Sequence, residues 1–256
     1  MSARRLPGAR LALITLAIAG LAVQNAPARA RDSAAAPSVL SMVVGSGGRI
    51  LSGAQAVSAS ATTVTIGHKR CAVAAGTALA VLAALRRAGG PAYGLRDYGR
   101  CGAAAVNSGQ LFVDSLAGEL NRGQNGWEYK VNGVSGTTGA ADSSGPQGDG
   151  RLLRSGDRVL WFWCQSLAGG CQRTLEVSAR SVVSRGGMLA VSVRGYDNDG
   201  QAVSIAGAIV KLGSDFASTR TGGRAVLIAP STPGRYQLSA THSGLVPCFP
   251  ETIVVR

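Results

Sequence analysis

The stretch GWEYKVNG, residues 126–133, decides the fold of the first part of the chain. In residues 126–131, aromatic and β-branched side chains fall on alternate positions, which is the pattern of a β-strand. Asn132 and Gly133 follow as the pair that favours positive φ in a tight two-residue hairpin turn. The stretch RVLWFWC, residues 158–164, is also rich in residues that prefer strands. These two stretches predict two strands of one β-sheet.

One amphipathic helix is predicted ahead of these strands. Thr77 is a suitable N-cap, and apolar residues recur from Ala78 at i, i+3, i+4 and i+7. Arg86 and Arg87 would lie in the last turn, where cations oppose the negative end of the helix dipole, and Gly-Gly-Pro at 89–91 ends the helix. A helix with a single apolar side must pack on a sheet, so the prediction is an α+β domain. The other strands predicted in this part are 39–44, 54–66 and 110–120.

Four motifs in chain order give this part of the chain a resemblance to a known family. They are the helix opening at 76–79, the hairpin at 126–133, the segment GAAD at 139–142 and the strand entry at 155–161. Through these motifs, residues 38–171 resemble the transcobalamin C-terminal-like family. The resemblance implies a β-grasp-like domain with one main helix, similar to the soluble-ligand-binding β-grasp domains. It also implies a site that holds or covers a small planar or corrinoid-like ligand.

The large aromatic side chains near the hairpin are the candidate ligand-binding groups. Trp127 and Tyr129 share one face of their strand, and Trp161 and Trp163 share one face of theirs. One pair is expected to pack under the helix, and the other could form a flat, exposed platform for a planar ligand. The alternative is that all four rings are core or cross-strand pairs. The candidate ligand-binding residues are therefore Trp127, Tyr129, Asn132, Trp161 and Trp163.

Residues 172–256 predict a second domain of a different class. They hold no convincing helix pattern, and short strand-like stretches alternate with turns at the spacing of an all-β sandwich. The segments TGGRA at 221–225 and TPGRY at 232–236 resemble parts of bacterial immunoglobulin-like modules, which implies a spacer or adhesive unit. The predicted strands are 175–179, 188–196, 208–212, 224–228, 236–240 and 252–255.

The N-terminus predicts export. Three arginines within the first ten residues precede the uncharged apolar run 11–23, and Ala-Arg-Ala at 28–30 places small residues at the −3 and −1 positions of a signal-peptidase site. The apolar run is too short to span the roughly 30 Å hydrocarbon core of a bilayer. We therefore predict a signal peptide at 1–30, a short linker at 31–37 and a secreted, extracellular mature chain with no membrane span.

Export favours disulfides for the cysteines, because disulfides persist outside the cytoplasm. The spacing predicts the pairs Cys71–Cys101 and Cys164–Cys171. Cys248 is left over, either buried as a small hydrophobic residue or available to another chain. Zinc is not predicted, because the chain has no C-x-x-C motif and neither histidine lies at ligand spacing to two cysteines.

The basic residues are spread along the chain. Lysine and arginine number 26 against 13 acidic residues, a formal net charge of +13, and no dense basic run contains interleaved aromatic residues. Nucleic-acid binding is therefore not expected. Weak attraction to anionic components of a cell envelope stays open.

Recognisable catalytic motifs are missing. The chain has no G-x-S-x-G elbow, phosphate loop, dinucleotide fingerprint or H-E-x-x-H, and no motif ties His68 or His242 to a nucleophile. The segment DNDG at 197–200 offers oxygen ligands, but no acid follows at the twelfth position of an EF-hand. A hairpin turn is therefore predicted there in place of a calcium loop. We expect no enzyme, no cofactor and no metal.

The sequence thus predicts a secreted, non-catalytic binding protein of two domains. The candidate partners are a small ligand, such as a cobalamin-like molecule, and components of the cell envelope. A structural or adhesive cell-envelope protein with no small-molecule ligand is the alternative function. A hydrolase with a triad assembled from distant parts of the chain is a third hypothesis.

Overall fold

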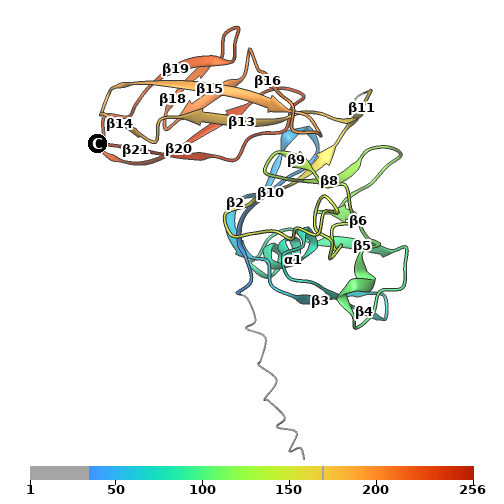
Figure 1. Cartoon of the computed structure of the whole chain (residues 1–256). Helices are drawn as coiled ribbons and strands as arrows, with labels where there is room; N and C mark the ends of the chain where they lie inside the picture. The colour runs from blue at the N-terminus through green and yellow to red at the C-terminus, as the bar shows by residue number, and fades with distance from the viewer. Residues whose placement is uncertain (1–34, 169) are drawn as a thin grey trace, which may run out of the picture. The chain divides into compact units, whose positions relative to one another are not determined.

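The computed structural model describes residues 35–168 and 170–256. The predicted signal peptide, residues 1–30, and the first part of the predicted linker, residues 31–34, lie outside the described residues. The described chain is mostly β, with a single α-helix among its residues and several sheets (Figure 1). The predicted α+β class is confirmed at this level, with strands in the majority. Within the described ranges, no helix combines the length and the apolar character needed to cross a membrane.

The main sheet of the first part is built around the two strands that the sequence predicts most clearly. Strand β10 (Arg158–Cys164) pairs antiparallel with β8 (Gly126–Val131) on one side and parallel with β1 (Ser38–Val44) on the other. The short strand β9 (Val134–Ser135) follows β8 through the predicted hairpin, and β2 (Ile50–Ser58) pairs with β1. The order across the sheet is therefore β2-β1-β10-β8-β9.

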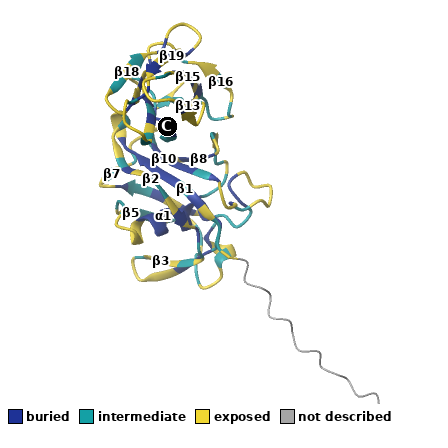
Figure 2. Ribbon diagram, turned by 90° about the vertical axis from the view of Figure 1, so that its left-hand side faces the viewer, coloured by how far each residue is buried: buried dark blue, intermediate teal, exposed yellow. Residues whose placement is uncertain are grey.

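Helix α1 (Ala78–Arg87) begins and ends where the sequence predicts. The Oγ1 of Thr77 accepts a hydrogen bond from the backbone N–H of Ala80 at 3.3 Å, so Thr77 is the N-cap. The first eight helical residues are buried, and all of them except Ala83 belong to one core with side chains of β1, β8 and β10. Figure 2 shows this concentration of buried residues in α1, β1 and β10. The helix therefore covers one face of the main sheet.

The stretch 54–66, predicted as one strand, is two strands in the structure. Its first half is the end of β2, and its second half is β3 (Thr62–Ile66), which pairs with β4 (Lys69–Val73) in a separate sheet. The chain turns between them, where the backbone N–H of Ser60 bonds to the carbonyl of Ser58.

The stretch 110–120 is likewise divided. It contains β6 (Leu111–Leu116) and β7 (Glu119–Leu120), separated by a turn with positive φ at Ala117 and Gly118. Both strands belong to a small sheet with β5 (Tyr93–Asp97), in the order β5-β6-β7. The remaining elements of the first part are η1 (Ser46–Gly48), η2 (Ala105–Ser108), β11 (Ser166–Leu167) and β12 (Gly170–Cys171).

Residues 172–256 form two sheets that share one apolar core. Buried side chains of both sheets, such as Val191 and Leu238, belong to the same cluster. All six predicted strands are present, and β14, β16 and β18 are additional short strands. The first sheet contains β13 (Thr174–Ala179), β15 (Met188–Tyr196), β16 (Ala202–Ser204) and β19 (Arg224–Ile228). The second contains β14 (Val182–Val183), β21 (Glu251–Val255), β20 (Gly234–Thr241), β17 (Ile209–Leu212) and β18 (Asp215–Ser218), in that order.

The main sheet of the first part is covered on its second face too. On the face opposite α1, Met42, Leu160 and Phe162 pack with Val246 and Phe249 from the second part of the chain. The described residues from 35 onward form one compact unit. The two predicted domains therefore share an apolar interface.

Both predicted disulfides are present. Cys71–Cys101 ties β4 to the loop after β5, and Cys164–Cys171 closes the end of β10. Cys248 is buried, and its Sγ accepts a hydrogen bond from the backbone N–H of Ala240 at 3.1 Å. Burial raises the pKa of this thiol to about 12. Of the two alternatives for Cys248, the structure therefore has the buried one.

Candidate functional site

The four aromatic rings near the hairpin lie in the core. Register decides this, because Trp161 is paired with Tyr129 and Trp163 with Trp127, which places all four side chains on the face that α1 covers. Trp127, Tyr129 and Trp161 are 4%, 5% and 1% exposed, and Trp163 is half-buried. The predicted exposed platform is therefore corrected to a set of cross-strand core pairs, with ring centroids 5.7 Å apart for Trp127–Trp163 and 5.3 Å apart for Tyr129–Trp161.

Asn132, the fifth candidate residue, holds the hairpin in place. It has a φ of 50° and Gly133 a φ of 87°, as a two-residue hairpin turn requires. Its Oδ1 accepts a hydrogen bond from the backbone N–H of Arg158 at 2.9 Å, and its Nδ2 donates to Asp157 Oδ1 at 2.8 Å. Asn132 also lines a cavity, so it is the candidate residue that leads to the site.

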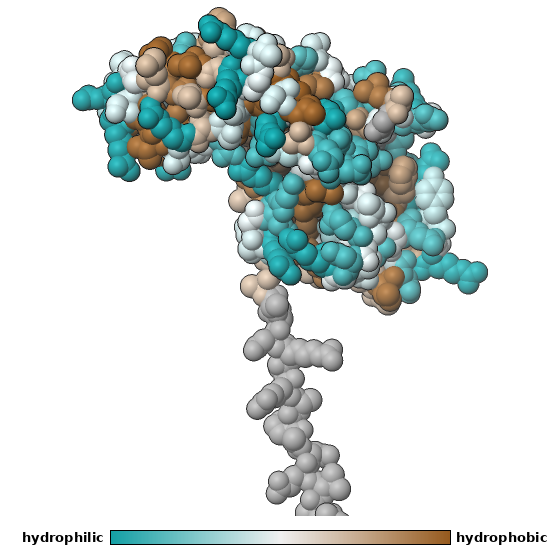
Figure 3. All heavy atoms as spheres, turned by 45° about the horizontal axis from the view of Figure 1, so that its top comes forward, coloured by the Kyte–Doolittle hydropathy of each residue, from teal (hydrophilic) through white to brown (hydrophobic). Residues whose placement is uncertain are grey.

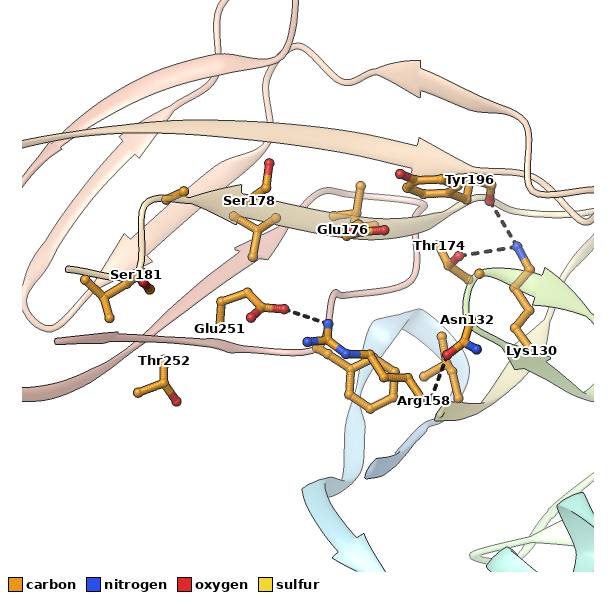
Figure 4. Close-up of a pocket in the computed structure, with 17 residues that line it drawn as sticks. Lys130, Asn132, Arg158, Thr174, Glu176, Ser178, Ser181, Tyr196, Glu251 and Thr252 are labelled. Atoms are coloured by element: carbon orange, nitrogen blue, oxygen red, sulfur yellow. Dashed lines mark hydrogen bonds and ion pairs between the residues drawn. The ribbon is translucent and has the colours of Figure 1, made fainter. Parts of the chain in front are cut away.

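That cavity, which we call the interstrand cleft, has a volume of about 410 Å³ and lies between the hairpin and the second part of the chain (Figure 4). Lys130, Asn132 and Arg158 line it from the first part. From the second part, β13 and the first residues of β21 line it. Its volume is within the usual range for ligand sites.

Lys130 is the most constrained group in the cleft. It alternates with Tyr129 and so points to the face opposite the aromatic core, where it is 1% exposed. Its Nζ donates hydrogen bonds to Asp197 O at 2.7 Å, Tyr196 O at 3.0 Å and Thr174 Oγ1 at 3.3 Å. Burial lowers its pKa to about 8, and the Asp197 carboxylate opposes that shift. Because all three donors are used, Lys130 joins the two parts of the chain and is not free for a ligand.

Arg158 forms the lower wall of the cleft in Figure 4. Its Nη1 lies 2.6 Å from Glu251 Oε1, and its guanidinium lies 5.7 Å from the centroid of the Phe249 ring. The two charges neutralise each other, and the ring supplies apolar surface beneath them. This wall therefore suits an uncharged, partly apolar group.

Unpaired strand edges make up the rest of the cleft. Apart from an isolated bridge between Thr174 and Val246, β13 pairs among the described residues only with β15 and is the edge strand of its sheet. The Leu175 N–H points away from β15, to the carbonyl of Val246, so strand alternation directs the backbone groups of Val177 and Ala179 the same way. Both residues line the cleft, and neither forms a backbone hydrogen bond on that side to another described residue.

The opposite side of the cleft has an open edge too. β14 pairs with β21 only at Val254 and Val255. The Val254 N–H points away from β20, to the carbonyl of Ser181, so the backbone groups of Thr252 point to the same side. Thr252 lines the cleft. Two strand edges therefore present free donors and acceptors to one cavity.

The other candidate motifs are not among the residues that line the cleft, although Asp197 contacts Lys130 at its edge. Residues 197–200 form the predicted hairpin turn between β15 and β16, where the Asp197 Oδ1 accepts hydrogen bonds from the backbone of Asp199 and Gln201. His68 is exposed and His242 is half-buried, and neither lines the cleft. No cluster of potential metal ligands occurs in the part of the chain that the structure describes.

Sequence reasoning missed Lys130 and the open edge of β13. Alternation gives a partial signal for Lys130, since it places this lysine on the face opposite Trp127 and Tyr129, but the pairing of β8 with β10 is needed to place it beside Leu160 and Phe162. The open edge has no comparable signal, because strand pairing depends on the whole fold.

Comparison with known proteins finds nothing similar: no family model, no curated protein and no solved structure matches the chain. The function is therefore argued from the site alone.

Proposed function

We propose that the chain is an exported, non-catalytic binding protein that takes an extended peptide segment of a partner into the interstrand cleft. The observation that carries the proposal is the pair of open strand edges at Ala179 and Thr252, which are half-buried, whereas Val177 on β13 is buried. A free edge binds an extended peptide by continuing the sheet, with main-chain hydrogen bonds supplying affinity and neighbouring side chains supplying specificity.

The chemistry of the walls favours recognition over catalysis. Among the described residues that line the cleft there is no histidine or cysteine, and its lysine and arginine are engaged by protein acceptors. The Phe249 ring and Leu160 offer apolar contact beside the edge of β13. The expected partner is therefore a short strand of about three to five residues, at roughly 3.3 Å per residue, with an apolar side chain facing Phe249.

Export and domain identity remain part of the proposal. Two disulfides within the chain support an oxidising compartment. The order β2-β1-β10-β8, with one helix on one face, supports a β-grasp-like identity for residues 38–171. Two sheets around one core support an immunoglobulin-like identity for residues 172–256.

A small ligand in the same cleft is the second candidate, because a volume of about 410 Å³ suits a small molecule. A planar or corrinoid-like ligand would have to use Asn132, Arg158 and Phe249, since Trp127, Tyr129 and Trp161 are buried. A purely structural envelope protein would bind neither kind of ligand.

Selection from a displayed library of random dodecapeptides against the full mature chain tests the proposal. We expect enriched peptides that slow the hydrogen exchange of the Ala179 and Thr252 amides. Ala179→Pro removes a donor on the open side of β13 while keeping its bonds to β15, so it should weaken binding at least tenfold. Ser218→Pro, in the edge strand β18 of the other sheet, is the matched control and should leave binding unchanged.

Two results would count against peptide binding. Enrichment of no peptide, or peptides whose affinity is the same for Ala179→Pro and the unchanged chain, rules out β13 as the docking edge. Titration with cyanocobalamin separates the second candidate, because saturable binding that shifts Asn132 and Arg158 signals without a peptide would support a small ligand.

A further inference from the structure

An exposed aromatic pair lies outside the cleft, with Phe112 on β6 and Tyr98 directly after the end of β5. Tyr98 is 67% exposed and Phe112 is 43% exposed, and their ring centroids lie 6.0 Å apart in an edge-to-face arrangement. On the face drawn in Figure 3, hydrophobic residues are scattered among hydrophilic ones, and single exposed apolar side chains are ordinary. This pair differs from single exposed apolar residues, because its two rings are adjacent and the Tyr98 ring borders a cavity.

The cavity beside Tyr98 is a shallow groove of about 730 Å³. Its polar side chains are those of Arg100, Asn107, Gln110 and Asp142. The side chains of Arg100, Asn107 and Gln110 form no hydrogen bond to any other described residue, so their donors and acceptors are free. Asp142 uses Oδ1 for Ser144 and keeps Oδ2 free.

The loop that carries Arg100 and Asn107 is held firmly. Cys101 is joined to β4 by the disulfide to Cys71. The Asp97 carboxylate accepts hydrogen bonds from the backbone N–H of Gly99 at 3.0 Å and of Cys101 at 3.3 Å, and it pairs with Lys69 at 3.1 Å. At the far end of the loop, the Ser108 hydroxyl donates to the carbonyl of Ala72. The groove is therefore formed before any ligand arrives, which lowers the entropic cost of binding.

We infer that this groove binds a saccharide. A sugar ring presents a flat apolar face of C–H groups, which can stack on Tyr98, and a rim of neighbouring hydroxyls. Amide and guanidinium groups offer paired polar atoms in one plane, which match such hydroxyls, and the free Oδ2 of Asp142 adds one acceptor. Arg100 and Asp142 carry opposite charges, so the groove suits a neutral ligand better than a phosphate-bearing one. The inference uses no residue of the interstrand cleft and is independent of the peptide proposal.

An array of bacterial, fungal and plant oligosaccharides, probed with the full mature chain, identifies the saccharide, and calorimetric titration of the best soluble one measures its affinity. Tyr98→Ala should weaken binding about tenfold or more, as expected for truncation of a central contact residue. Tyr98→Phe keeps the ring and should stay within about threefold of the unchanged chain. Gln110→Ala removes a rim contact without touching the ring and should also weaken binding.

Phe216→Ala is the matched control, since Phe216 is 70% exposed but belongs to β18 in the second part. It should leave affinity unchanged, and so should Ala179→Pro in the cleft. The inference is overturned if no saccharide on the array binds, or if Tyr98→Ala and Phe216→Ala have equal affinities. It is also overturned if a thymidine octamer binds through Tyr98 and saccharides do not.

Discussion

Replacing Lys130 by methionine tests whether the two parts of the chain are held together by a buried ammonium. Lys130→Met keeps a similar apolar stem and removes the charge. Asp197 O, Tyr196 O and Thr174 Oγ1 then lose their shared donor inside the protein. Because Lys130 is 1% exposed, water cannot replace that donor without rearrangement of the cleft.

The expected loss of stability is the difference between two opposing effects. A hydrogen bond to a charged donor contributes about 1.5–3 kcal/mol, and three are lost. The lowering of the Lys130 pKa from 10.5 to about 8 shows that burial disfavours the charged form, by roughly 3 kcal/mol. Removing the charge recovers much of that cost. The free energy of unfolding should therefore fall by roughly 1.5–6 kcal/mol at pH 6.

The sign of the pH dependence follows from the direction of the pKa shift. The folded-state pKa of Lys130 lies below the unfolded value, so the native chain releases this proton first as the pH rises. Between about pH 8 and pH 10.5 the unfolded chain binds more protons, and the Lys130 contribution to stability increases with pH. The difference in the free energy of unfolding between the unchanged chain and Lys130→Met should therefore increase by about 1–2 kcal/mol between pH 7 and pH 9.5.

Urea unfolding followed by tryptophan fluorescence measures both effects. Lys211→Met is the control, because Lys211 is exposed on β17 and its loss should change stability by less than about 0.5 kcal/mol. The chain has three lysines, so selectively labelled ε-methylene groups give three NMR signals, and the Lys130 signal should titrate near pH 8. Equal stability of Lys130→Met and Lys211→Met at every pH, or a Lys130 signal that titrates above pH 10, would refute the reasoning.

Three further predictions use other parts of the fold. Replacing Cys71 and Cys101 by serine should lower the free energy of unfolding by about 3.5 kcal/mol, and replacing Cys164 and Cys171 by about 2.5 kcal/mol, because the first disulfide closes the longer loop; equal losses in urea unfolding would contradict this explanation. Thr77→Ala should cost about 1 kcal/mol through the lost N-cap, whereas Thr77→Ser should keep most of the stability, and thermal unfolding compares the two. Cys248 should resist iodoacetamide at pH 8 until the chain is unfolded, because burial raises its pKa to about 12; rapid labelling of the native chain, followed by mass spectrometry, would count against its burial.

Local patterns predicted much of the fold. The N-cap at Thr77, the hairpin turn at Asn132 and the strand β10 all depend on residues close in sequence, and each is found where expected. Both disulfides also follow from spacing and the expectation of export. These features need no knowledge of which strands become neighbours.

Tertiary arrangement limited the prediction of the site. Alternation alone shows that Trp127 and Tyr129 share a face, but only the pairing of β8 with β10 shows that Trp161 and Trp163 join them under α1. Likewise, whether β13 has one partner or two depends on strands far along the chain. The aromatic residues therefore belong to the core on the α1 face of the main sheet, whereas the cleft is lined from the opposite face of that sheet.

Because both faces of β10 are apolar, the two parts of the chain cannot readily be separated and fused to other proteins. A fragment that ends near residue 172 would leave Leu160 and Phe162 in water, and a fragment that begins there would uncover Val246 and Phe249. Each fragment would tend to self-associate through that surface. Gene fusion and exon-like shuffling must therefore move the two segments as a pair, even though each has its own sheets.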